Sequence, residues 1–225
     1  MSEAHESSTG ADQRPIRVLI VDDHEVLAAS LAMVLDAEDD ITTAGVATTL
    51  EQARALIDTT QPDVVLLDHR MPDGDGVAAI PDFRAVHPSI GVVVLTASAA
   101  DHVLLAAIDA GASGFLSKTR SLAEVTAAVR AAAAGESVIS PELLARLLPR
   151  FGRVKVRSAD ELTDREREVL ALVAEGLSNA AIAERLVVSV HTVRNHIASL
   201  SAKLGAHSKL EALSIAVRQG LLPDL

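Results

Sequence analysis

The chain has 225 residues, of which 49% are hydrophobic, so it is long enough to form one or two ordinary cores. It contains no cysteine, which excludes a disulfide framework, a thiolate metal site and a thiol nucleophile. No segment has the pattern of a signal peptide or approaches the ~18 apolar residues of a membrane span. We therefore expect a cytoplasmic protein without membrane contact, preceded by a disordered tail over residues 1–15.

The net charge of −11 is unevenly distributed along the chain. Residues 151–225 carry 10 Lys and Arg against 9 Asp and Glu, net +1, whereas residues 1–150 carry 10 against 22, net −12. This asymmetry suggests two units with different tasks. The aromatic residues are Phe83, Phe115 and Phe151, so a platform for stacking single-stranded bases is not expected, and any bound nucleic acid should be duplex.

Five short apolar runs alternate with helix-period segments through the first half of the chain. The runs, mostly rich in β-branched residues as buried parallel strands are, cover residues 17–21, 41–46, 63–67, 91–95 and 113–117. The helical segments cover residues 24–38, 49–60, 75–87, 101–110 and 121–134. Pro81 is expected near the first turn of the third helix, where proline is best tolerated. The pattern predicts a (βα)5 doubly wound parallel sheet, with helices on both faces, over residues 16–135.

The second half has a different, all-helical pattern. A short amphipathic helix at residues 140–151 and a polar stretch at 153–161 predict a linker over residues 136–160. Thr163 and Glu166 then show capping-box spacing ahead of an apolar stripe. Four helices are expected at residues 164–175, 179–186, 190–204 and 208–220, forming a small all-α domain over residues 161–225.

Polar residues follow four of the predicted strands. Asp22 and Asp23 follow the first strand, Asp68 the third, Thr96 the fourth and Lys118 the fifth. Because the carboxyl ends of parallel strands lie at one edge of a sheet, these side chains should converge on one crevice. Crowded carboxylates need a cation, and their hard oxygen atoms suit Mg²⁺, which pairs naturally with phosphate. We therefore expect this site to bind a phosphoryl group.

The first half of the chain resembles the receiver domain of bacterial two-component response regulators. The segments that carry the resemblance are 21–24, 68–76, 96–97 and 114–118. The resemblance implies that Asp68 accepts a phosphoryl group from a phosphohistidine on a sensor histidine kinase. It also implies that Asp23 and Asp68 bind Mg²⁺ directly, that Asp22 does so largely through water, and that the backbone carbonyl of Arg70 completes the protein ligands. The chemistry would be nucleophilic catalysis with a metal clamp. His69, beside the acceptor, is given no role.

The same resemblance places Thr96 and Phe115 at the switch positions of the family, with Lys118 beside the phosphoryl group. Phenylalanine lacks the hydroxyl of the tyrosine that is commoner there, which excludes a hydrogen bond from that ring but not its rotation. An acidic receiver would also oppose an acidic duplex, so we hypothesise that the unphosphorylated chain binds DNA weakly.

Residues 162–213 resemble the LuxR-type helix-turn-helix, and the whole chain therefore resembles a NarL/FixJ-type response regulator. In such a motif the helix at 179–186 supports a turn, and this turn positions the helix at 190–204 in a major groove. Ser189 or Thr192 should cap this recognition helix. Its stripe of Val193, Ile197, Leu200 and Leu204 should face the core. The expected DNA-facing residues are His191, Thr192, Arg194, Asn195, His196, Ala198, Ser199 and Lys203.

Within that face, the resemblance places Arg194, Asn195 and Ala198 at base contacts and Thr192 and His196 at phosphate contacts. The last helix, with Leu210, Leu213 and Val217, most resembles the dimerisation helix of the family, although a core-facing role alone would explain its apolar stripe. The implied assembly is a homodimer on double-stranded DNA.

Three alternatives stay open on sequence alone. The second domain could be a helical protein-interaction module whose basic residues form a solvated face. The chain could be an atypical regulator that binds DNA without phosphorylation. It could also be a Mg²⁺-dependent aspartate-nucleophile phosphohydrolase, although such enzymes typically carry the nucleophile after the first strand with a second Asp two residues on, where this chain has Arg70. We expect no enzymatic activity beyond phosphorylation and dephosphorylation of the chain itself.

Overall fold

The computed structural model describes residues 14–97, 100–151 and 162–222. Its first unit is a five-stranded parallel sheet with the order β2-β1-β3-β6-β7. The strands are β1 (Ile16–Val21), β2 (Ile41–Ala47), β3 (Val64–Asp68), β6 (Gly91–Thr96) and β7 (Gly114–Ser117). Every residue of the central strand β3 is buried, as a strand covered on both faces requires. The predicted doubly wound sheet is confirmed.

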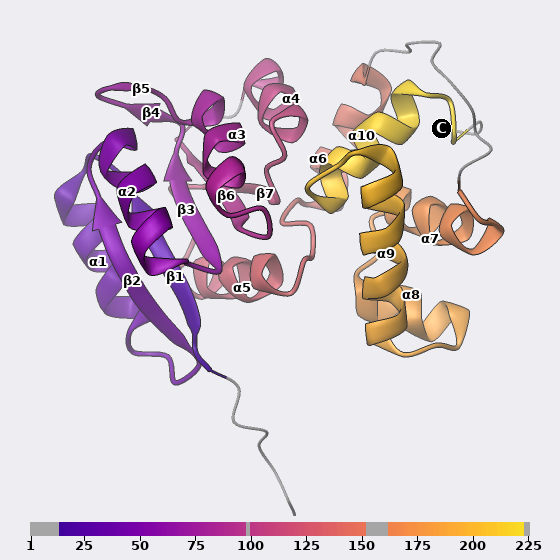
Figure 1. Cartoon of the computed structure of the whole chain (residues 1–225), viewed down its shortest axis with the longest axis horizontal. Coiled ribbons are helices and arrows are strands. Elements are labelled where there is room, and N and C mark those ends of the chain that lie inside the picture. Colours follow the sequence, from indigo (N-terminus) through magenta and orange to yellow (C-terminus); the bar gives the residue numbers. More distant parts are fainter. Residues whose placement is uncertain (1–13, 98–99, 152–161, 223–225) are drawn as a thin grey trace, which may run out of the picture.

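Helices cover both faces of this sheet (Figure 1). The helices α1 (Glu25–Leu35) and α5 (Leu122–Ala133) pack on one face, where their apolar side chains share a cluster with β1, β3 and β6. On the other face lie α2 (Leu50–Thr60), α3 (Gly76–Val86) and α4 (Asp101–Asp109), packed in a second cluster. The two clusters make the three-layer architecture that the alternating apolar runs predict.

Two local features of this unit differ from expectation. The helix α3 begins at Gly76, so Pro81 lies inside the helix rather than near its first turn, and that expectation was wrong. Ile80 and Phe83, both fully buried, hold the helix on the sheet despite the missing N–H of Pro81.

A small antiparallel hairpin of β4 (Arg70–Met71) and β5 (Gly74–Asp75), which the sequence did not predict, follows the central strand.

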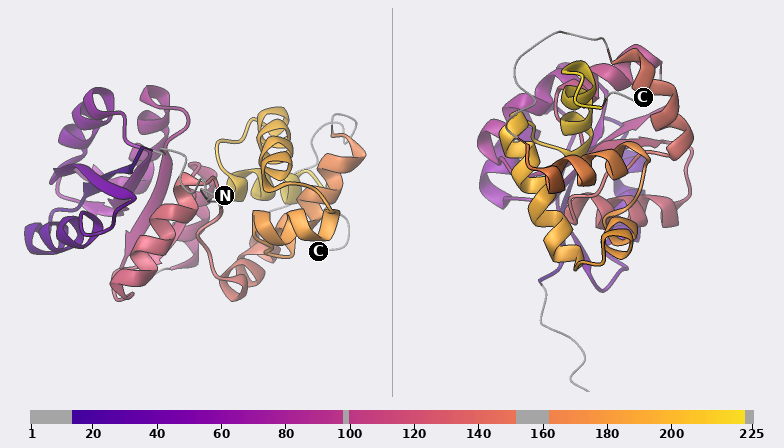
Figure 2. Two further views of the ribbon diagram at one scale, coloured as in Figure 1. Left: turned by 90° about the horizontal axis from the view of Figure 1, so that it is seen from below. Right: turned by 90° about the vertical axis from the view of Figure 1, so that its right-hand side faces the viewer.

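The second unit is the predicted helical one, with α7 (Asp164–Ala174), α8 (Asn179–Leu186), α9 (Val190–Leu204) and α10 (Lys209–Arg218). The capping box of Thr163 and Glu166 is confirmed at the start of α7. The Oγ atom of Ser189 accepts from the backbone N–H of Thr192 at 3.0 Å, so Ser189 is the cap of α9. The two units lie side by side along the long axis of the molecule (Figure 2).

Val187 closes α8 in a left-handed conformation, with φ 54° and ψ 48°. For a β-branched residue this conformation costs about 1–2 kcal/mol. Its N–H bonds to the last turn of α8, and its side chain is 91% exposed. The strain is therefore the local cost of the tight turn that sets the angle between α8 and α9.

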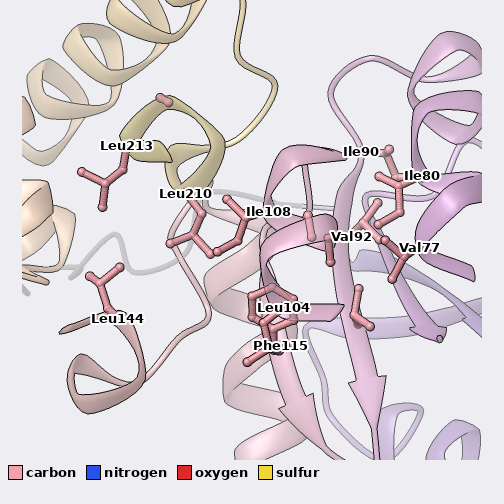
Figure 3. Close-up of a cluster of buried hydrophobic side chains, with 14 of the residues drawn as sticks. Val77, Ile80, Ile90, Val92, Leu104, Ile108, Phe115, Leu144, Leu210 and Leu213 are labelled. Atoms are coloured by element: carbon pink, nitrogen blue, oxygen red, sulfur yellow. The ribbon is translucent and has the colours of Figure 1, made fainter. Parts of the chain in front are cut away.

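The segment between the units is itself packed. It contains α6 (Pro141–Leu147) and a 3₁₀ turn, η1 (Leu148–Arg150), and its apolar side chains join the cluster that lies under α4 and α10 (Figure 3). The polar stretch predicted as linker at residues 153–161 lies outside the described residues. So do residues 1–13 of the predicted tail, whereas Arg14 is placed, with Nη2 2.8 Å from Asp63 Oδ1. No helix of the described ranges has the length and apolarity needed to cross a bilayer.

Candidate functional site

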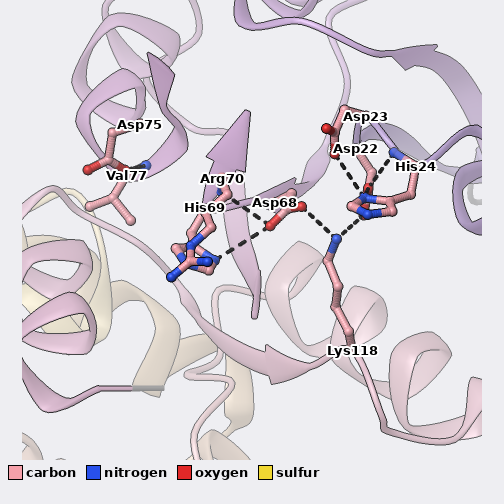
Figure 4. Close-up of polar contacts among 9 residues, drawn as sticks. All are labelled: Asp22, Asp23, His24, Asp68, His69, Arg70, Asp75, Val77 and Lys118. Atoms are coloured by element: carbon pink, nitrogen blue, oxygen red, sulfur yellow. Dashed lines mark hydrogen bonds and ion pairs between the residues drawn. The ribbon is translucent and has the colours of Figure 1, made fainter. Parts of the chain in front are cut away.

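Three carboxylates meet at the carboxyl edge of the sheet, as the strand ends predict (Figure 4). Asp22 follows β1 and is fully buried, and Asp68 ends β3 with 4% exposure. With Asp23 and His24 they form a cluster whose possible ligand atoms all lie within 4.8 Å of one another. A cavity of about 370 Å³ opens onto this cluster. The structure therefore brings the predicted acidic residues together.

Lys118 joins two of these carboxylates. Its Nζ lies 2.7 Å from Asp22 Oδ2 and 2.6 Å from Asp68 Oδ2. Burial opposes the charge of this ammonium group, but the two carboxylates outweigh burial and raise the pKa of Lys118 above its ordinary value. The backbone N–H of Lys118 donates to the carbonyl oxygen of Thr96 at 2.9 Å. Lys118 therefore stays charged and is held where it would meet a group bound to Asp68.

His24 completes the cluster and was not among the residues predicted for the site. Its Nδ1 lies 3.0 Å from Asp22 Oδ1 and 2.9 Å from Asp23 Oδ1. The only available signal was its position directly after the two aspartates. The three carboxylates still supply the hard oxygen donors that Mg²⁺ prefers, from two strands and around an open cavity, so the residues fit that ion.

The loop after Asp68 is held by close backbone contacts. A Cβ atom at Gly76 would overlap the carbonyl oxygen of Asp68, so only glycine fits there. The carboxylate of Asp73 accepts from the N–H groups of Leu50 and Glu51 at the start of α2, at 3.0 and 3.2 Å, which lowers the pKa of Asp73. These contacts fix the hairpin and, with it, the position of the acceptor.

Of the predicted switch residues, Thr96 ends β6 and Phe115 is the second residue of β7. Thr96 is 4% exposed and Phe115 is 7% exposed, and both line a groove of about 470 Å³ that runs along α5 to the segment 137–140. The N–H of Phe115 donates to Val138 O at 2.8 Å. Strand β7 thus leads at its end to Lys118 of the acidic cluster, and its N-terminal part is bonded to the segment that leads to the second unit.

The recognition helix α9 has the predicted amphipathic arrangement. Val193, Ile197 and Leu200 are buried against α7 and α8. The exposed residues of its other face include His191, Arg194, Asn195, Ala198, Ser199 and Lys203, and Thr192 and His196 are half-buried.

Two of these residues are engaged with a buried glutamate. The Nζ of Lys203 lies 2.7 Å from Glu166 Oε2, and the Oγ of Ser199 donates to Glu166 Oε1 at 2.6 Å. Burial alone would raise the pKa of Glu166, but Lys203, Ser199 and Thr163 together lower it to about 2. In this conformation Lys203 and Ser199 hold α9 against α7 rather than presenting free groups to DNA.

A buried ionic cluster links the receiver-like unit to the helical unit. Glu136, just after α5, accepts from the backbone N–H of Asn179 at 2.9 Å, at the start of α8. Its Oε2 lies 3.2 Å from Nζ of Lys209, which also donates to the carbonyl oxygen of Leu177. Burial lowers the pKa of Lys209 although Glu136 opposes that shift. Sequence reasoning missed this cluster because its members are far apart in the chain.

Further contacts attach α10 to the receiver-like unit. Ser214 and Arg218 of α10 contact the carboxylate of Asp109 at 3.0 and 3.2 Å. Leu210 and Leu213, which the sequence places on the dimerisation surface, are 1% and 0% exposed. They belong to an apolar cluster that includes residues of α4 and α6 (Figure 3), and Val217 packs against that cluster. In this conformation the surface is covered.

A cavity of about 520 Å³ lies between α9 and the receiver-like unit. Arg194 and Ala198 line one wall, and Arg84 and Glu136 are among the residues of the opposite wall. Burial lowers the pKa of Arg84 to about 10, while Glu211 of α10 acts in the opposite direction. Two of the three predicted base-contacting residues therefore face the other unit.

Comparisons with known proteins match both units. The model of the response regulator receiver domain matches residues 18–130, and the model of bacterial regulatory proteins of the luxR family matches residues 160–216. The DNA-binding transcriptional activator DevR/DosR of Mycobacterium tuberculosis (strain ATCC 25618 / H37Rv) is 36% identical over 208 residues, which cover 89% of this chain and 94% of that protein.

Two solved structures resemble this chain over most of its length. The crystal structure of the response regulator ChrA, from a heme-sensing two-component system, is 35% identical with a TM-score of 0.50 and covers 93% of this chain and 100% of that chain. A structure of two RcsB dimers bound to two parallel DNAs is 26% identical with a TM-score of 0.54, covering 91% and 99%.

The lowered pKa of Glu166 predicts a pH-dependent contribution to stability. The ionised carboxylate contributes fully above about pH 4.5, and this contribution is lost as the pH falls toward 2. Glu166→Gln should destabilise the protein by about 2 kcal/mol at pH 7, and the difference from wild type should shrink below pH 4.5. Calorimetry of the full chain between pH 7 and pH 3 measures this. The control is Glu168→Gln on the same helix. If the difference in stability between wild type and Glu166→Gln stayed constant with pH, the lowered pKa of Glu166 would be contradicted.

Proposed function

Because this chain belongs to the response regulators that join a receiver domain to a LuxR-type DNA-binding domain, we propose that it is a transcriptional regulator controlled by phosphorylation of Asp68. The family consists of transcriptional regulators and not of classical enzymes, which leaves no support for the phosphohydrolase alternative. The observation that carries the proposal is the position of Asp68, which is buried at the end of the central strand and paired with Lys118 at 2.6 Å.

In the proposed reaction, a carboxylate oxygen of Asp68 attacks the phosphorus of a phosphohistidine on a sensor kinase. The bond from phosphorus to the histidine nitrogen breaks, and an aspartyl phosphate forms. Lys118 supplies a fixed positive charge to the phosphoryl oxygens, and Thr96 supplies a hydroxyl. Asp22, Asp23, Asp68 and the backbone carbonyl of Arg70 would hold Mg²⁺, which neutralises charge on the transferring group when bound. The chain would catalyse only its own phosphorylation and dephosphorylation.

The acceptor assignment predicts a phosphoryl adduct on one residue. Wild-type protein incubated with Mg²⁺ and a small phosphodonor should gain one phosphoryl mass, and Asp68→Asn should gain none. Intact-mass spectrometry reads both outcomes, and Asp63→Asn, outside the cavity, is a matched control that should still be modified. Absence of an adduct on the wild type would favour a regulator that works without phosphorylation.

For the second unit we propose that α9 reads the major groove of duplex DNA, with Arg194, Asn195 and Ala198 at the bases and Thr192 and His196 at phosphates. A helical protein-interaction module is the weaker reading, because the luxR-family match spans the whole unit. The buried stripe of α9 packs on its own domain and leaves the opposite face of the helix uncovered by that domain, as a reading helix requires.

Arg194→Ala should weaken binding to a preferred duplex about 10- to 100-fold, and should weaken binding to a scrambled duplex much less. The preferred duplex is selected by the protein from a random library, and both affinities are measured at one salt concentration. The control Arg185→Ala removes the same charge from α8. Equal losses on the two duplexes would make Arg194 a phosphate contact.

We further propose that the described conformation is the weakly binding one. Its support is the cavity wall formed by Arg194 and Ala198, together with the burial of Leu210 and Leu213 in an apolar cluster to which α4 and α6 contribute. Phosphorylation would favour separation of the domains, after which Leu210, Leu213 and Val217 could form a homodimer surface on DNA. The alternative is a surface that serves only the core of the chain.

The ionic cluster around Glu136 offers a direct test of this closed state. Glu136→Gln leaves Lys209 buried without a carboxylate, so the unphosphorylated variant should bind the preferred duplex about tenfold more tightly than wild type. The control is Glu38→Gln, which makes the same charge change at an ion pair with Arg130 within the receiver domain. Equal gains in the two variants would show an effect of net charge alone and would contradict inhibition by domain contact.

A further inference from the structure

His69 follows the acceptor directly, and nothing in the proposed function uses it. Its side chain is 14% exposed, and its Nδ1 lies 3.5 Å from Asp68 Oδ1. That distance is too long for a well-formed hydrogen bond, and the buried Nδ1 has no hydrogen-bond partner among the residues that the structure describes. Buried polar atoms are rarely left unpaired, so an orphan beside a reactive carboxylate indicates a ligand of that site.

The backbone holds this imidazole firmly in place. The carbonyl oxygen of His69 accepts from the N–H of Gly76 at 2.9 Å, and its N–H points to the carbonyl oxygen of Leu95 at 3.4 Å. The ring stands between the phosphoryl cavity and a neighbouring cavity of about 620 Å³ under α4, because it lines both. Figure 4 shows it on the opposite side of Asp68 from Lys118. The acceptor is therefore flanked by a nitrogen on each side.

The atom nearest to Nδ1 determines which tautomer of the ring suits this position. A carboxylate oxygen only accepts hydrogen bonds, so the tautomer with its hydrogen on Nδ1 is the one that fits beside Asp68 Oδ1. Nδ1 is then a hydrogen-bond donor next to the acceptor. An aspartyl phosphate would place further negatively charged acceptor oxygens within this small cavity.

We propose that His69 Nδ1–H donates a hydrogen bond to the phosphoryl group carried by Asp68, as a phosphoryl-binding residue additional to Lys118 and Thr96. The proposal rests on the proposed phosphorylation of Asp68. Lys118 approaches from the Oδ2 side of the carboxylate, and His69 approaches from the Oδ1 side, where the N–H of Arg70 also donates at 3.2 Å. The missing partner of Nδ1 is then an oxygen of the phosphoryl group.

The test uses beryllium trifluoride as a phosphoryl mimic, bound to the full chain in the presence of Mg²⁺ and followed by calorimetry or fluorine NMR. His69→Phe keeps the ring and removes both nitrogens, and it should weaken binding about tenfold, as expected for one charge-assisted hydrogen bond. His69→Asn places an amide nitrogen near the position of Nδ1 and should restore most of the affinity. His102→Phe, across the neighbouring cavity, is the control and should bind like wild type.

Two further measurements distinguish the loss of a contact with the phosphoryl group from a general disturbance of the fold or of the metal site. The affinity for Mg²⁺ alone and the melting temperature should be the same in wild type and His69→Phe. Wild-type affinity in His69→Phe would overturn the proposal, and so would an equal loss of Mg²⁺ affinity or a greater loss in His69→Asn than in His69→Phe. If the wild type itself bound no mimic, the phosphorylation of Asp68 would fail instead.

Discussion

The charge balance of the receiver site is determined by one lysine among three carboxylates. Lys118 neutralises part of the charge of Asp22 and Asp68, and Asp23 is contacted by His24. Negative charge in excess at a partly buried edge is unstable unless further positive charge arrives. A phosphoryl group would add still more negative charge. In the proposed reaction, cation binding and phosphoryl binding would therefore depend on each other, and neighbouring donors such as the backbone N–H of Arg70 would affect that balance.

The same excess of acidic residues contributes ion pairs to the contact between the domains. Asp109 and Glu136 of the receiver side pair with Arg218 and Lys209 of the DNA-binding domain. The charge asymmetry of the sequence thus appears in the structure as attraction between the units. A duplex carries the same sign of charge as the receiver domain, so in the proposed closed state the receiver domain would repel a duplex that approaches α9.

The sequence predicted what depends on periodicity and on strand ends. The five strands, the helices of both units, the capping box at Thr163 and the convergence of Asp22, Asp68 and Lys118 all follow from local pattern and from the rule that parallel strands end at one edge. Contacts between distant segments could not be predicted in this way. Burial of Leu210 against α4 depends on how the domains dock, and the orphaned Nδ1 of His69 depends on ring placement within a fraction of an ångström.

A continuous chain of contacts joins the two ends of the proposed switch. Lys118 and Phe115 lie on β7 or directly after it, and the N–H of Phe115 bonds to Val138, two residues beyond Glu136. In the proposed switch, a shift of β7 toward a phosphoryl group would therefore pull on the segment that carries Glu136, the carboxylate paired with Lys209. A buried ion pair contributes little net stability while intact, yet losing its geometry is costly, so a small displacement can change the balance between closed and open states. In this conformation Arg194 and Ala198 of α9 line a cavity beside the receiver domain, and Leu210 of α10 is buried beside α4. Separation of the domains would therefore free the proposed reading helix and the proposed dimerisation surface in one step.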